Sequence, residues 1–128
     1  MRLLLDTHAL LWWLDGDRRL SVRARRLIGD ETNAVLVSAA SAWEITTKFR
    51  LGKLPGAADV AADVLGCVAG QGFLTLDISV LHAQRAGGLP GLHRNPFDRM
   101  LVAQAQLEDI AIVSDDAVFD GCGVRRVW

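Results

Sequence analysis

The segment MRLLLDTHALLWWL, residues 1–14, places a short apolar run directly before an acid and the start of a helix. The three leucines from Leu3 to Leu5 indicate a strand that is buried on both faces, as in a parallel sheet. Asp6 follows at the end of this strand, and residues 7–14 are predicted to form a helix. The segment therefore predicts the first strand–helix unit of an α/β chain.

An acid follows an apolar run at two further places. The run from Val35 to Val37 predicts a second strand, and Glu44 lies two turns into the helix that should follow it. The run from Ile110 to Val113 predicts a third such strand, closed by Ser114, Asp115 and Asp116. Continuous apolar runs bounded by turn residues are typical of buried parallel strands.

Asp98 belongs to the segment HRNPFDRMLVAQAQLE, residues 93–108, which has the pattern of an amphipathic helix. Asn95 is the expected N-cap and Pro96 the first helical residue, so Asp98 falls in the first turn. Ligands of open parallel sheets bind beyond the carboxyl ends of the strands. We expect all four acids at that edge: Asp6, Glu44, Asp98 and Asp116.

Such a cluster favours a bound cation. Two carboxylates about 6 Å apart repel by roughly 3 kcal/mol at an effective dielectric constant near 20. Carboxylate oxygens are hard ligands that suit Mg²⁺ or Mn²⁺. Each acid also has a structural alternative, which stays open at this point. Asp6 could cap a helix, Glu44 could form a capping box with Ser41, Asp98 could complement a helix dipole, and Asp116 could be a turn residue.

The remaining pattern alternates strands and helices and predicts an α/β fold with a parallel sheet of about five strands. A Gly/Pro loop is expected from Gly87 to Asn95. The predicted order is strand 3–5, helices 7–14 and 21–30, strand 35–37, helices 39–51 and 57–69, strand 73–76, helix 79–86, the Asp98 helix, and strands 110–113 and 124–127.

Composition fits a single domain over residues 1–128. The chain has 51% hydrophobic residues and a net charge of −1, so it is no general polyanion binder. The apolar segment from Ala9 to Leu14 is too short to span a membrane, and the N-terminus lacks a signal-peptide layout. We expect a cytoplasmic protein without membrane contact. Cys67 and Cys122 are isolated in sequence and are expected to stay reduced.

Arginine supplies 12 of the 14 basic residues, and five of these lie between positions 17 and 26. Arginine suits phosphate contact and base stacking, so this segment is a candidate nucleic-acid contact. A solvated helix face is the alternative, and charge runs alone favour it. Trp12, Trp13 and Trp43 could stack on bases, but the ALLWWL segment (residues 9–14) is more typical of a core or a subunit interface.

Four segments, taken in order, resemble the PIN-domain ribonucleases of the VapC toxin type: LLLDTHALLWWL, VSAASAWEITTKFRLGKL, LPGLHRNPFDRMLVAQAQ and IVSDDAVF. The resemblance covers essentially the whole chain. It implies a PIN-like three-layer α/β/α sandwich and assigns divalent metal binding to Asp6, Glu44, Asp98 and Asp116. Asp116 matches the family better than Asp115, since it lies two residues after Ser114. Asn95 stands where the family more often has Asp.

The resemblance further implies an endoribonuclease that cuts single-stranded or looped RNA, with a small cognate antitoxin as partner. Mg²⁺ or Mn²⁺ would activate water and neutralise phosphate charge. We expect Asp6 and Asp98 as direct ligands, because they are taken to lie closest to strand ends. Glu44 and Asp116 would bind the ion through water or orient the nucleophile. The hydroxyls beside the acids, from Thr7, Ser38 and Ser114, would support the carboxylates. A role as helix cap is an equal alternative for Ser38 and Ser114. His8, Lys48 and Arg99 are candidate substrate contacts. A homodimer is expected from the apolar Ala9–Leu14 segment.

Two other classes fit parts of the pattern. A phosphoacceptor receiver domain needs a lysine late in the chain, and no lysine follows Lys53. A catalytically silent PIN-like module that binds RNA or a partner stays open, although all four acids are present. The spacing of His8, His82 and His93 matches no zinc hydrolase motif.

Overall fold

The computed structural model describes residues 1–91 and 95–128. Five parallel strands form one sheet in the order β3-β2-β1-β4-β5. The strands are β1 (Arg2–Leu5), β2 (Ala34–Ser38), β3 (Leu74–Leu76), β4 (Ala111–Val113) and β5 (Arg126–Val127). The predicted parallel sheet of about five strands is confirmed. The last strand is shorter than the predicted 124–127.

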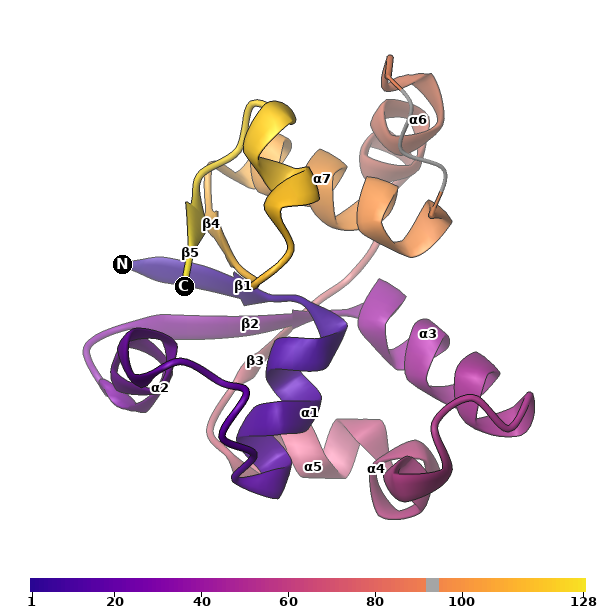
Figure 1. Cartoon of the computed structure of the whole chain (residues 1–128). Helices are drawn as coiled ribbons and strands as arrows, with labels where there is room; N and C mark the ends of the chain where they lie inside the picture. The colour runs from indigo at the N-terminus through magenta and orange to yellow at the C-terminus, as the bar shows by residue number, and fades with distance from the viewer. Residues whose placement is uncertain (92–94) are drawn as a thin grey trace.

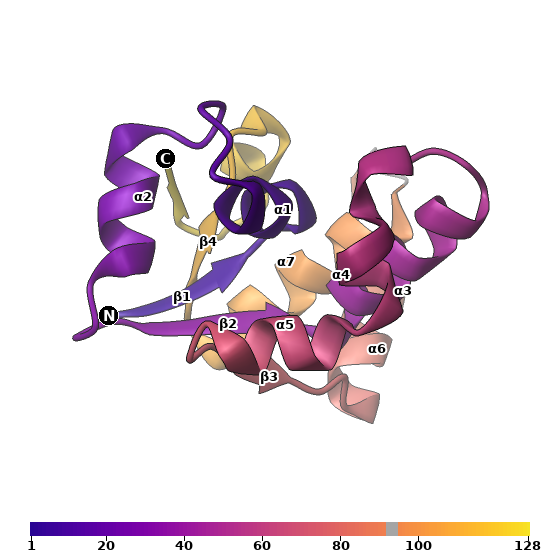
Figure 2. The same ribbon diagram turned by 90° about the horizontal axis from the view of Figure 1, so that it is seen from below.

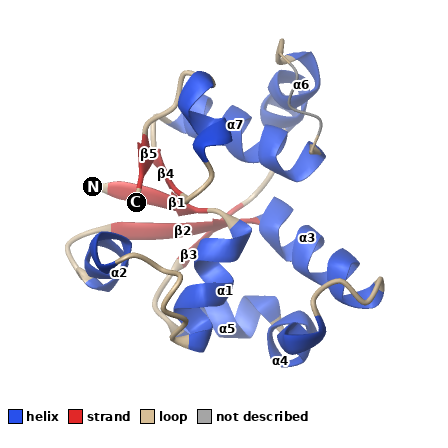
Figure 3. Ribbon diagram, in the orientation of Figure 1, coloured by secondary structure: helices blue, strands red, loops and turns tan. Residues whose placement is uncertain are grey.

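Helices cover both faces of the sheet, which Figures 1 and 3 show nearly edge-on. One face carries α1, α2, α4 and α5, and the other carries α6, α7 and the 3-10 helix η2. The helices of the described residues are α1 (Thr7–Asp15), α2 (Val22–Gly29), α3 (Ala39–Arg50), η1 (Pro55–Ala57), α4 (Ala58–Ala62), α5 (Val64–Gly70), α6 (Val80–Gly88), α7 (Pro96–Glu108) and η2 (Ala117–Gly121). The fold is a three-layer α/β/α sandwich, as expected.

The strand residues explain the three layers. Side chains alternate between the faces of a strand, so Leu3 and Leu5 of β1 point into one core and Leu4 into the other. All three leucines are fully buried. Leu10 of α1 and Ile28 of α2 complete the first core. The second core receives its helical side chains from α7 and η2.

Local capping chemistry sets several helix starts. Ser21 caps α2 by accepting the Ala24 N–H at 3.0 Å, and Asn95 caps α7 with Pro96 at its first turn, both as predicted. The single helix predicted over 57–69 is wrong. Asp63 leaves helical geometry and accepts the Gly66 N–H at 2.9 Å, so it ends α4 and starts α5.

One helix ends at a different residue than expected. The helix predicted over 79–86 runs further, to Gly88, so the loop expected from Gly87 to Asn95 is shorter; its residues 92–94, which include His93, lie outside the described part. The view from below in Figure 2 shows α5 beside the edge strand β3. No helix among the described residues has the length and apolar character needed to cross a membrane.

Candidate metal-binding and catalytic site

Asp6 begins the site, because it follows β1 at the carboxyl edge of the sheet. Its backbone N–H donates to the Val113 carbonyl at the end of β4 (3.1 Å), which fixes the two strand ends together. Its side chain accepts the Ala9 N–H at 2.7 Å and caps α1. The Ser114 hydroxyl donates a second hydrogen bond to the carboxylate. The capping alternative for Asp6 is therefore correct, and a carboxylate with two oxygens can cap and still bind an ion.

Burial of Asp6 has an electrostatic cost. The residue is 7% exposed, and this burial raises the pKa of its carboxyl group from 3.8 to about 6. Hydrogen bonds from Ser114 and Ala9 oppose the rise, and the charge of nearby Asp115 adds to it. A group whose charged form is disfavoured in this way gains from a neighbouring cation.

Glu44 is buried where α3 passes α1. Its carboxylate accepts a hydrogen bond from the Thr7 hydroxyl at 2.5 Å and forms an ion pair with Lys48, one turn further along α3. Glu44 is 3% exposed. Ser38 caps α3, so the alternative of a capping box between Ser41 and Glu44 is wrong. Thr7 thus supports an acid as expected, whereas Lys48 neutralises Glu44 within the protein.

Asp98 belongs to the first turn of helix α7, as the sequence predicts. It lies half-buried in the first turn of α7, where Asn95 accepts its N–H at 3.4 Å. The neighbouring ring of Phe97 meets Trp43 edge to face, with ring centroids 5.0 Å apart. Since Trp43 precedes Glu44, this contact brings the first turn of α7 to the part of α3 that carries Glu44.

Asp116 lies beyond the end of β4, and Ser114 connects it to Asp6. The Asp116 backbone N–H donates to the Ser114 hydroxyl oxygen at 3.0 Å, while that hydroxyl donates to Asp6. The Asp116 side chain is exposed and caps η2 by accepting the Val118 N–H at 3.0 Å. The turn alternative is therefore correct for its local role, and its exposure leaves it accessible to an ion.

Two predicted substrate contacts have different surroundings. Arg99 donates to the carbonyls of Ala86, Gly87 and Leu89 at distances of 2.7–3.3 Å, so its guanidinium group closes the end of α6. His8 is exposed on α1. The structure thus gives Arg99 a structural role and leaves His8 open to solvent.

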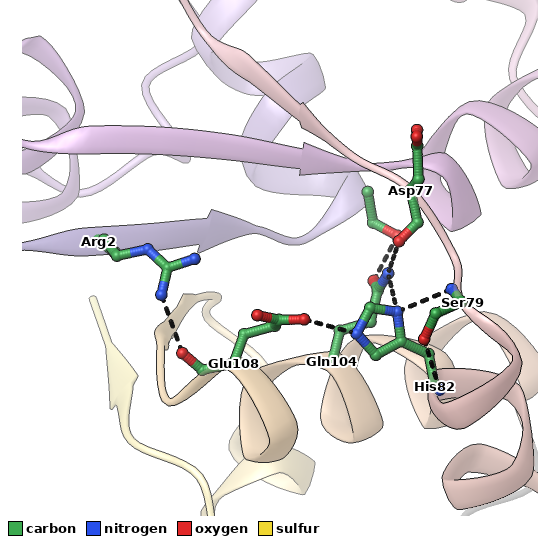
Figure 4. A network of polar contacts seen from close by, with 7 residues as sticks. Arg2, Asp77, Ser79, His82, Gln104 and Glu108 are labelled. Atoms are coloured by element: carbon green, nitrogen blue, oxygen red, sulfur yellow. Dashed lines mark hydrogen bonds and ion pairs between the residues drawn. The ribbon is translucent and has the colours of Figure 1, made fainter.

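Ser38 supports the site indirectly, through a buried polar network that the sequence analysis missed. Its hydroxyl donates to Gln104 Oε1 at 2.6 Å, so it has no second proton to donate to a carboxylate. Gln104 is fully buried, and its amide donates to the Asp77 carbonyl at 3.2 Å. Figure 4 shows Gln104 between Asp77 and the ring of His82. The end of β2 is thereby fixed to α7.

His82 extends this network to the far end of α7. Its Nδ1 accepts the Ser79 N–H at 3.0 Å, so in the neutral ring the proton sits on Nε2, which faces Glu108 at 2.8 Å. The Glu108 carbonyl in turn accepts from Arg2 at 2.9 Å (Figure 4). The sequence signal was the spacing of a capping box, since Ser79 lies three residues before His82. Histidine stands there in place of the usual Glu or Gln.

The donor chemistry at this edge fits a divalent cation. The segments that carry the four acids, namely the end of β1, α3, the start of α7 and the end of β4, lie toward one end of the sheet (Figure 1). Asp6 in particular is an acid whose pKa burial raises, although hydrogen bonds from Ser114 and Ala9 oppose the rise. Within residues 1–91 and 95–128, however, no three His, Cys, Asp or Glu side chains form a preassembled ligand set.

The chain combines a three-layer α/β/α sandwich with acids at the carboxyl edge of its parallel sheet. Its sequence also matches a class of protein with these features. The PIN domain family model matches residues 3–123, so the chain belongs to the PIN domain family. This membership confirms the resemblance on which the four acids were assigned. It leaves the role of each acid as a prediction.

Several known proteins are similar to this chain in sequence or in fold. The chain is 38% identical over 74 residues to Ribonuclease VapC16 of Mycobacterium tuberculosis, a match over 56% of this chain and about half (52%) of that relative. A chain of the VapBC2 complex of Rickettsia felis, bound to a promoter DNA fragment, superimposes with a TM-score of 0.72 at 15% identity, covering 99% and 98% of the two chains.

VapC20 of M. tuberculosis, described as a toxin that cleaves the sarcin-ricin loop, superimposes with a TM-score of 0.67 at 15% identity. The alignment covers 98% of each chain. At these identities the structural matches establish the fold alone.

Proposed function

We propose that this chain is an endoribonuclease of the VapC toxin type that depends on Mg²⁺ or Mn²⁺. The observation that carries the proposal is Asp6, a buried acid with a raised pKa at the carboxyl edge of a PIN-domain sheet. An acid in this state favours a cation beside it. The similarity to Ribonuclease VapC16 supports RNA as the substrate.

Four carboxylates would hold the ion: Asp6, Glu44, Asp98 and Asp116. When bound, such an ion lowers the pKa of a water molecule and neutralises charge on a scissile phosphate. The chain's own hydroxyls orient the acids. Ser114 donates to Asp6, and Thr7 donates to Glu44. Lys48 balances the charge of Glu44, which makes Glu44 the acid that depends most on rearrangement to reach an ion.

The proposal includes a small antitoxin as partner and a cytoplasmic location, which would bring toxin, antitoxin and RNA together. Structural neighbours from VapBC complexes support the antitoxin. An antitoxin arginine could pair with the acids in place of metal, because guanidinium binds carboxylate through two parallel hydrogen bonds. Co-purification of a small protein encoded beside this gene would support this part, and its failure to bind the purified chain would count against it.

The proposal also includes a homodimer, but the structure changes the reason for it. The Ala9–Leu14 segment packs into or against the core of its own chain, so it no longer requires a partner. Trp43 of α3 is 62% exposed and is a better candidate for burial between subunits. Light scattering at micromolar concentration tests the dimer, and a monomer at all concentrations would exclude it.

The decisive experiment is cleavage of a structured RNA by the purified chain with Mg²⁺, with Mn²⁺ and with EDTA. Asp6→Asn or Asp98→Asn should lower the rate by at least about 100-fold, because a charge-stabilising ligand is weakened. Asp109→Asn is the matched control. Asp109 ends α7 in left-handed geometry that asparagine also adopts, at the far end of that helix from Asp98.

Two outcomes would contradict the proposal. Cleavage that continues in EDTA would show that the reaction needs no divalent metal ion. RNA binding without cleavage under any metal would instead support the second candidate, a catalytically silent PIN-like module, for which the ion pair between Glu44 and Lys48 already provides an argument.

A further inference from the structure

A pocket of about 480 Å³ lies beside the acidic edge, and the proposed chemistry does not use most of it. It is an open depression of the surface and not an enclosed cavity, so a ligand in it would keep one side exposed to solvent. It is lined by His8, Trp12, Arg19, Asp115, Asp116 and Ala117. One wall is aromatic and cationic, and the other is acidic and leads to Ser114 and Asp6.

Arg19 is held in place on this pocket. Its guanidinium group pairs with Asp17 through both Nε and Nη2, at 2.7–3.2 Å. This contact is strong enough to lower the pKa of Asp17 to about 2. On another side the guanidinium lies over the ring of Trp12, 5.0 Å from the ring centre. The Arg19 side chain is nevertheless 69% exposed.

The rings around Arg19 are fixed as well. Trp12 is half-buried against the core, and its ring meets Trp128 edge to face with centroids 5.9 Å apart. The exposed ring of His8 lies 5.6 Å from Trp12, tilted by 39°. The packed ring of Trp12 and the ion-paired guanidinium of Arg19 thus offer flat groups that the protein already restricts before a ligand arrives, which reduces the entropy cost of binding.

We propose that this pocket is a nucleobase subsite, in which an unpaired RNA base stacks on the guanidinium plane that Asp17 and Trp12 hold in place. The inference rests on the proposed function for its choice of RNA over other flat ligands. Unpaired bases stack on arginine planes and aromatic rings in RNA-binding proteins.

The polarity of the pocket fits a nucleotide better than a free aromatic molecule. A base against Arg19 and His8 would leave its phosphodiester near Asp115 and Asp116, which repel it unless a cation is present. The subsite would therefore position the phosphate next to the proposed metal site. Because every base has a flat face, stacking of this kind is tolerant of sequence.

If RNA binding depended only on net charge, Arg19→Lys would bind like wild type and Asp17→Asn would bind as well or better. Substitutions can therefore separate base stacking from a simple charge effect. Arg19→Lys keeps the charge but removes the planar group. Asp17→Asn removes one negative charge, which raises the net charge of the protein by one unit, but it also removes the ion pair that holds Arg19. We expect both variants to bind a fluorescein-labelled, 12-nucleotide single-stranded RNA about five-fold or more weakly, measured by anisotropy with Ca²⁺ in place of Mg²⁺ or Mn²⁺. Arg18→Lys, at the exposed neighbouring position, is the matched control and should bind within about two-fold of wild type.

Removal of single bases from the RNA provides a second readout that a folding defect would not change. An abasic site at the stacked position should weaken binding to wild type, and should cost Arg19→Lys little further. Thermal melting of each variant shows whether it is folded. Asp17→Asn binding as well as or better than wild type would overturn the subsite in favour of nonspecific electrostatics, as would absence of binding up to about 500 µM protein.

The outcomes distinguish this inference from the proposed function. If wild type cleaves RNA with metal while Arg19→Lys and Asp17→Asn bind and cleave equally well, the subsite is wrong and the nuclease stands. If Arg19→Lys loses binding but no metal supports cleavage in wild type, the subsite stands and the nuclease is wrong.

Discussion

Replacement of Asp6 by asparagine should make the metal-free protein more stable at neutral pH. The change keeps an oxygen to accept the Ala9 N–H, and asparagine caps helices about as well as aspartate. It removes a negative charge that is only 7% exposed. The substitution therefore isolates the cost of burying the charge from the benefit of the cap.

The raised pKa sets the size and the sign of the effect. The pKa of Asp6 is about 6 in the folded chain and 3.8 in the unfolded chain. Between these values the folded state holds more protons, so stability falls as pH rises through this window and the full cost is present above about pH 6. At about 1.36 kcal/mol per pKa unit, the cost is about 3 kcal/mol. The new amide N–H groups need acceptors, which reduces the expected gain to about 1–3 kcal/mol.

Thermal unfolding in EDTA, followed by circular dichroism, measures this gain. At about pH 7.5 Asp6→Asn should raise Tm by roughly 3–10 °C. At about pH 4 the charge penalty falls to roughly 0.5 kcal/mol, so the difference should nearly vanish. Asp116→Asn is the control, because Asp116 is also an N-cap but is exposed, and its effect should stay within about 0.5 kcal/mol. Equal destabilisation of Asp6→Asn at both pH values would refute the reasoning.

Three further predictions concern the metal and the supporting contacts. Millimolar Mn²⁺ should raise the Tm of wild type at neutral pH and should raise that of Asp6→Asn much less. At a Mn²⁺ concentration of 100 times Kd, the expected gain in the free energy of unfolding is about 2.7 kcal/mol. Gln104→Ala should cost about 2–4 kcal/mol in urea unfolding, since it leaves a cavity and unpaired groups at Ser38 and Asp77, whereas exposed Gln84→Ala should change little. Arg99→Lys should cost about 1–2 kcal/mol, because lysine cannot serve three carbonyls with a planar fork; exposed Arg23→Lys is its control in the same unfolding experiment.

The sequence by itself determined the order of the five strands and the element on which or after which each of the four acids lies, but not the break between α4 and α5. Three buried strands could be predicted from their apolar runs: Leu3 to Leu5 and the runs before Ser38 and Ser114. A strand covered on both faces needs continuous apolar residues. Parallel strands place their carboxyl ends together, so Asp6 and Asp116 were predictable neighbours. Helix starts at Ser21 and Asn95 followed from capping, which depends on residues within one turn.

Tertiary structure alone decided the contacts between residues distant in sequence. No local pattern pairs Thr7 with Glu44, joins Ser38 to Gln104, or brings Phe97 of α7 against Trp43 of α3. Those contacts depend on how α3 and α7 pack, and side-chain positions follow from that packing. The charge state of Asp6 was hidden for the same reason, since burial is a property of the folded chain and not of a residue's neighbours in sequence.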